Sequence, residues 1–70
     1  MRYVVWQAGK KEQLVEFCKF LKTKGVKVGR LWTSHGPDDL GQPAVNVYCR
    51  KTRVFALCKG KKFPGVYTSG

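Results

Sequence analysis

The chain has 70 residues, of which 14 are lysine or arginine and only 4 are aspartate or glutamate, so its formal net charge is +10. A chain of this length supports one hydrophobic core and excludes a second, so we treat residues 1–70 as a single domain. Hydrophobic residues make up 43% of the sequence and aromatic residues 13%, which excludes an intrinsically disordered chain.

Cysteine usage and the N-terminal segment indicate a cytoplasmic protein without a membrane partner. Three cysteines, Cys18, Cys49 and Cys58, leave one thiol unpaired in any disulfide scheme, and each stands among apolar residues, as buried thiols do. The apolar run Arg2–Gln7 is far shorter than the roughly 20 residues of a membrane span. The charged KKEQ segment that follows it does not fit a signal peptide.

The first half of the chain is predicted to form a strand, a helix and a second strand. Residues Arg2–Ala8 are β-branched and aromatic, which favours a strand. An apolar stripe at helical spacing predicts a helix over Lys10–Lys24, which Gly25 ends. That stripe consists of Leu14, Phe17, Cys18 and Leu21. The segment Val26–Ser34 again has the composition of a strand.

Gly29 lies inside this second strand, where a glycine marks either a β-bulge or a close approach of another backbone. A bulge would insert one residue into the alternation of side chains. Val28 would then share a face with Leu31, while Arg30 and Trp32 would both turn to the opposite face. The bulge therefore decides which residues of this strand face a ligand.

The middle of the chain is predicted to contain a loop and a third strand. The segment His35–Pro43 collects glycine, proline and aspartate, which are typical of turns. From Ala44–Arg50 the residues Asn46, Tyr48 and Arg50 alternate with apolar residues, as in a strand with one buried face.

The segment after Thr52 can be interpreted in two ways. As a helix it is capped by Thr52, ends at Gly60 and precedes a short strand, Val66–Ser69. As a strand it would pair with Ala44–Arg50, but the intervening dipeptide lacks the glycine or asparagine that a two-residue hairpin prefers. We favour the helix. The fold is then α+β, a small ferredoxin-like βαββαβ split fold with a four-stranded, mainly antiparallel sheet and both helices on one face.

The other face of this sheet is open, and it is predicted to carry Arg30, Trp32, Tyr48 and Arg50. Bases stack on aromatic and guanidinium planes while cations hold the phosphates, so this combination favours single-stranded nucleic acid. In gross layout the arrangement resembles the RNA-recognition-motif family. The segment NVYCR at Asn46–Arg50 lacks the glycine–aromatic signature of that family's third strand, so the resemblance is one of topology and chemistry. The alternative is that Trp32 and Tyr48 are ordinary rim or core aromatics.

The C-terminal third is cationic, because no carboxylate follows Asp39. A surface of this kind attracts phosphates, and Phe63 or Tyr67 offers a ring for stacking. The predicted nucleic-acid contacts in this segment are Arg50, Lys51, Arg53, Lys59, Lys61, Lys62 and Phe63. The alternative is a solvated edge whose lysines protect exposed strands from pairing.

The chain contains no recognisable catalytic set, phosphate loop or nucleotide fingerprint. His35 is its only histidine, and with Asp38 and Asp39 it supplies neither a second base nor an oxyanion cradle. We therefore predict no enzyme, no metal and no cofactor. The predicted function is binding of DNA or RNA, with single strands or RNA favoured. The alternative is a regulator or inhibitor, of the kind that viruses encode, which docks on an acidic surface of a nucleic-acid-processing enzyme.

Overall fold

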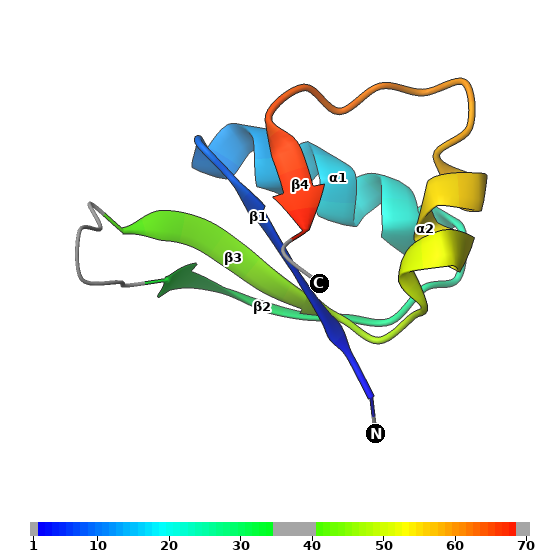
Figure 1. Cartoon of the computed structure of the whole chain (residues 1–70), viewed down its shortest axis with the longest axis horizontal. Helices are drawn as coiled ribbons and strands as arrows, with labels where there is room; N and C mark the ends of the chain where they lie inside the picture. The colour runs from blue at the N-terminus through cyan, green and yellow to red at the C-terminus, as the bar shows by residue number, and fades with distance from the viewer. Residues whose placement is uncertain (1, 35–40, 69–70) are drawn as a thin grey trace.

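The computed structural model describes residues 2–34 and 41–68, which form one four-stranded sheet and two helices (Figure 1). In chain order the elements are β1 (Val4–Ala8), α1 (Lys11–Thr23), β2 (Val28–Ser34), β3 (Gln42–Val47), α2 (Lys51–Leu57) and β4 (Val66–Thr68). The sheet has the strand order β2-β3-β1-β4, and each neighbouring pair is antiparallel. This confirms the predicted α+β fold and agrees with a ferredoxin-like split fold.

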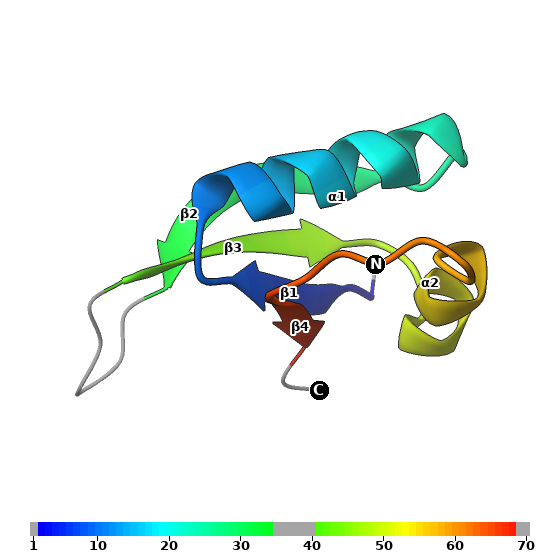
Figure 2. The same ribbon diagram turned by 90° about the horizontal axis from the view of Figure 1, so that it is seen from above.

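Helix α1 lies along one face of the sheet (Figure 2). Its buried residues are those of the predicted apolar stripe, Leu14, Phe17, Cys18 and Leu21. The ring of Phe17 packs against that of Trp6 in β1, with 5.0 Å between their centroids. Gly25 ends the helix with a φ of 78°, a left-handed conformation that glycine adopts without strain. The core therefore lies between α1 and the sheet.

Helix α2 confirms the favoured interpretation of the last third of the chain. It begins at Lys51 with Arg50 as the preceding residue, so Thr52 lies within the first turn and the prediction of Thr52 as the cap is wrong. Val54 is fully buried, and the ring of Phe55 lies 5.4 Å from that of Trp6. Both helices therefore contact the same side of the sheet, and α2 lies at the end where β3 finishes (Figure 1).

The bulge that was one of the two possibilities for Gly29 is present in β2. Gly29 and Arg30 together oppose one residue of β3, Asn46, because Val28 and Leu31 pair with the two valines that flank it. A Cβ atom added to Gly29 would lie 3.5 Å from the Asn46 carbonyl oxygen, which is an ordinary van der Waals distance, so no unusually close approach of the backbones is found here. Of the two features that the glycine suggested, the bulge is therefore the one that is found.

The boundaries of β3 differ from the prediction of Ala44–Arg50. The strand begins at Gln42 and ends at Val47, so Pro43 belongs to it and Arg50 does not. Pro43 pairs with Thr33 of β2, in the part of β3 beyond the reach of β1, where a missing N–H disturbs the sheet least. The remainder of the predicted loop, residues 35–40, lies outside the described residues.

The three cysteines carry no disulfide, and Cys18 is buried whereas Cys49 and Cys58 are half-buried. Burial raises the pKa of the Cys18 thiol, and the neighbouring Lys22 opposes this in part. Burial likewise raises the pKa of Cys58, with Lys61 opposing it. Thiols with raised pKa values are poor nucleophiles, which fits a packing role for these two residues.

Candidate nucleic-acid interface

The face of the sheet away from α1 carries one row of four side chains that crosses all four strands. Trp32 pairs with Ala44, Ala44 with Gln7, and Gln7 with Tyr67. At about 4.8 Å between neighbouring strands, the row spans about 14 Å. A tryptophan therefore stands at one edge of this face and a tyrosine at the other, with two smaller side chains between them.

Hydrogen bonds hold the polar ends of these two edge aromatics. The Trp32 indole Nε1 donates to the Asn46 Oδ1 at 3.2 Å. The Tyr67 hydroxyl donates to the Gln42 Oε1, and because β1 lies between β4 and β3, this bond spans a strand. Trp32 remains 42% exposed and Tyr67 43% exposed, whereas Ala44 between them is fully buried. The hydrogen bonds thus hold the polar edge of each ring, and a large part of each side chain stays accessible to solvent.

Two further tyrosines lie where β1 begins and β3 ends. The rings of Tyr3 and Tyr48 meet edge to face, with 5.8 Å between their centroids. Tyr3 is 52% exposed, and the half-buried Tyr48 has the Lys27 ammonium 5.8 Å from its ring centroid. We call Tyr3, Trp32, Tyr48 and Tyr67 the open-face aromatics.

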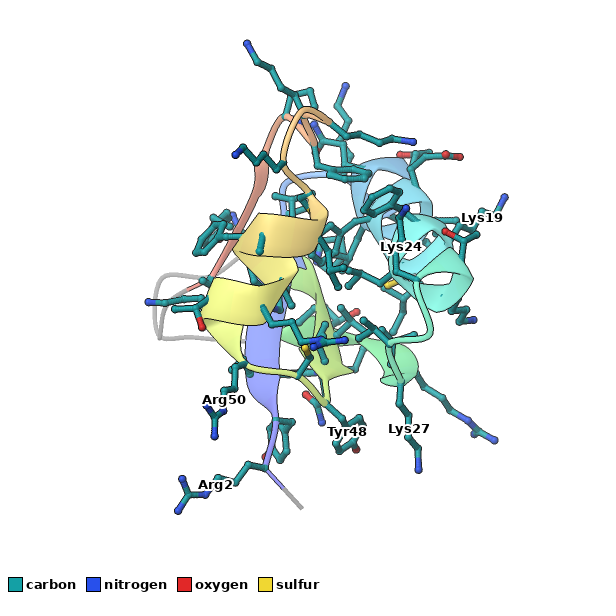
Figure 3. The ribbon with its side chains drawn as sticks, turned by 90° about the vertical axis from the view of Figure 1, so that its right-hand side faces the viewer. Arg2, Lys19, Lys24, Lys27, Tyr48 and Arg50 are labelled. Carbon is teal, nitrogen blue, oxygen red and sulfur yellow. The ribbon has the colours of Figure 1, made fainter. Side chains whose placement is uncertain are left out.

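Cationic side chains gather around Tyr48. Arg2, Tyr3, Tyr48 and Arg50 line a depression of about 410 Å³ at this end of the sheet. Figure 3 shows Arg2, Lys27 and Arg50 projecting from the same end of the molecule as Tyr48. These three cations come from the start of β1, the turn after α1 and the start of α2, so only the fold brings them together. We call them the sheet-end cluster.

The predicted C-terminal cations do not form one surface. Arg50 and Arg53 line a second depression at the sheet end, of about 600 Å³, together with Tyr48. Lys61 and Lys62 instead line a groove of about 360 Å³ along α1. Of the remaining two, Lys51 is half-buried in the first turn of α2 and Lys59 is exposed after its end.

Glu12 and Glu16 also line the groove along α1, so Lys61 and Lys62 have acidic neighbours that the order of the chain does not reveal. The Lys61 ammonium lies 5.0 Å from the ring centroid of Phe20. Among the described residues Glu12 and Glu16 are the only acids, and both belong to α1. The other two carboxylates, in residues 35–40, fall outside the description.

Phe63 lies in a different environment from the other predicted contacts. Its half-buried ring packs against Phe17 and Phe20 of α1, with centroid distances of 5.3 and 5.4 Å. These contacts use the ring as part of the core, and we therefore leave Phe63 out of the proposed interface. The remaining predicted residue, Arg30, is exposed in the bulge of β2.

Sequence reasoning did not include Tyr3 in the site, although a signal for it exists. Val4, Trp6 and Ala8 contribute to the core side of β1, so strict alternation places Tyr3 and Gln7 on the opposite face. The prediction treated the whole segment as largely buried because it is so apolar. An exposed aromatic at the end of a buried strand is therefore found by its position in the alternation and not by its composition.

Within residues 2–34 and 41–68, no three histidine, cysteine, aspartate or glutamate side chains come together as a metal site. No helix in the described part of the chain has the length and apolarity to cross a bilayer. No protein family matches the sequence, and no curated protein or solved structure is significantly similar to the chain.

Proposed function

We propose that this protein binds single-stranded nucleic acid on the open face of its sheet. The observation that carries the proposal is the set of four open-face aromatics beside the sheet-end cluster, on a face where the structure describes no carboxylate. Stacking of one base on an aromatic side chain contributes about 1–3 kcal/mol. Neutralised phosphates add affinity through the release of counterions.

Single strands fit this surface better than a duplex does. In a duplex the faces of the bases are already stacked, so the rings of Trp32 and Tyr67 would have no partner. The cations alone would attract either form, because phosphate contacts carry no preference for unpaired bases. Single-stranded DNA and RNA both present free base faces, so the proposal covers both. The preference for single strands therefore depends on the rings.

The experiment measures binding of labelled single-stranded DNA, single-stranded RNA and duplex DNA by fluorescence anisotropy at low salt. Trp32→Ala and Tyr67→Ala should each weaken single-strand binding by about 1–3 kcal/mol, or about 5- to 150-fold, without changing the salt dependence. Phe55→Ala is the matched control, because this ring is 56% exposed but lies on α2, outside the open face. It should bind like the wild type.

Two outcomes would contradict the proposal. Equal losses for duplex and single strand would mean that the surface recognises polyanions through charge alone. Absence of affinity for all three nucleic acids, with capture of an acidic protein from nuclease-treated lysate, would favour docking on an acidic enzyme surface instead. Circular dichroism of each variant establishes that the substitution has not unfolded the domain.

A further inference from the structure

Two depressions on this protein are lined by cations and differ in their electrostatic surroundings. Lys61 and Lys62 line their groove together with Glu12 and Glu16, and carboxylates on the same groove reduce the potential that a phosphate experiences there. The Lys61 ammonium is also engaged by the ring of Phe20. The groove that Lys61 and Lys62 line is therefore the weaker of the two for attracting a polyanion.

The sheet-end cluster has no such neutralisation among the described residues. The depression of about 410 Å³ there is lined by Arg2, Tyr3, Val4, Tyr48, Cys49 and Arg50, and no carboxylate contributes to it. Lys27 adds its charge from the opposite side of the Tyr48 ring (Figure 3). Arginine suits phosphate because its planar group donates two parallel hydrogen bonds to two oxygens.

The sheet-end cluster also continues directly from the open face. Tyr48 connects the two, because its ring contacts Tyr3 and it lines both depressions at this end of the sheet. Along β3, the distance from the row containing Ala44 to Tyr48 is about 13 Å, at about 3.3 Å per residue. A strand stacked on the rings of this row therefore reaches the cations by extending about 13 Å along β3.

On this basis, which presupposes the proposed function, we infer that the bound strand leaves the open face over the end where β1 begins and β3 finishes. Arg2, Lys27 and Arg50 there bind phosphates of nucleotides beyond those stacked on the sheet. The substrate is thus a single strand long enough to extend past the sheet, and a very short strand uses the rings alone. Lys61 and Lys62 lie off this path.

The test compares two double variants that remove the same charge. Arg2→Gln with Arg50→Gln alters the sheet-end cluster, and Lys61→Gln with Lys62→Gln is the matched control. Anisotropy titrations use fluorescein-labelled oligothymidylate and oligouridylate of about 4, 8 and 16 nucleotides, the range of site sizes found for small single-strand binding domains. Each titration is repeated over a series of salt concentrations.

The sheet-end variant should lower the slope of log affinity against log salt by about 0.7 per lost contact, or about 1.4 in all, for the longer strands. It should also lose most of the gain in affinity that the wild type shows between the shortest and longest strands. The control should retain that gain and lower the slope by less than half as much. Equal slopes for the two double variants would overturn the inference, because only net charge would then matter.

Failure of the inference is distinguishable from failure of the proposed function. If Trp32→Ala weakens binding but the two double variants behave alike, the open face binds the strand and the exit path is wrong. If Trp32→Ala and Tyr67→Ala bind like the wild type, or if the wild type binds no strand, both proposals are wrong. Thermal melts of the double variants show whether their folds are intact.

Discussion

Replacing Phe17 by alanine should remove most of the stability of the domain. Phe17 is only 2% exposed, and its ring contacts both Trp6 of β1 and Phe63 of the segment before β4. Truncating a buried phenylalanine costs about 3–5 kcal/mol, through lost transfer energy and the cavity left behind. At about 0.05–0.15 kcal/mol per residue, a domain of 70 residues has a total of about 3.5–10 kcal/mol.

Urea denaturation followed by circular dichroism measures this loss. For a small domain the free energy of unfolding falls by about 1 kcal/mol per molar urea, so the midpoint should move down by about 3–5 M. Phe55→Ala is the control, because that ring also contacts Trp6 but is 56% exposed, and its midpoint should move by less than about 1 M. Similar midpoints for the two variants would refute the assignment of Phe17 to the core.

Three further results are expected. Gly65→Ala should melt below Gly29→Ala, because Gly65 has a φ of 82°, which residues with a Cβ rarely adopt, whereas Gly29 has no positive φ and the nearest atom to its added Cβ is 3.5 Å away. In native protein Cys18 should react with iodoacetamide more slowly than the half-buried cysteines, and mass spectrometry in urea should show equal reaction at all three. Burial raises the pKa of the Cys18 thiol in the folded state. The stability that the protonated thiol contributes is therefore complete below the pKa of the unfolded thiol, about 8.5, and is lost as the pH rises through the pKa of the folded thiol. The free energy of unfolding should therefore fall more for the wild type than for Cys18→Ala between about pH 7.5 and about pH 9.5, and parallel curves would contradict this.

The elements that sequence patterns predicted best are those governed by local periodicity. The stripe that includes Phe17 fixed α1 to within one residue at each end, because a helix that buries one face must repeat apolar residues at that spacing. Gly29 marked the site where a bulge could lie. The extra residue there shifts the alternation of the residues that follow, so that Trp32 lies on the open face. For the start of β3 the prediction relied on local turn propensity and assigned Pro43 to the loop. In the structure the pairing of Pro43 with Thr33 of β2 extends the strand instead.

The candidate site was predictable only in its strand residues. Alternation placed Tyr48 on the open face, a bulge at Gly29 would place Trp32 there, and the structure agrees with both. The cationic surfaces were not predictable, since Lys61 comes beside Glu16 through the path of the chain after α2. Sequence order likewise does not indicate that Phe63 packs on α1, because such contacts join residues far apart in the chain.

The bulge in β2 also affects how copies of the chain meet at high concentration. β2 is at the edge of the sheet, so its outer side presents backbone groups that another molecule's strand could pair with. At Gly29 and Arg30 the extra residue interrupts the regular spacing of these groups, and it places a guanidinium in the strand that approaching copies would repel. An incoming strand finds a continuous ladder only over Leu31–Ser34, which is shorter than the roughly six or seven residues typical of segments that form stable intermolecular sheets.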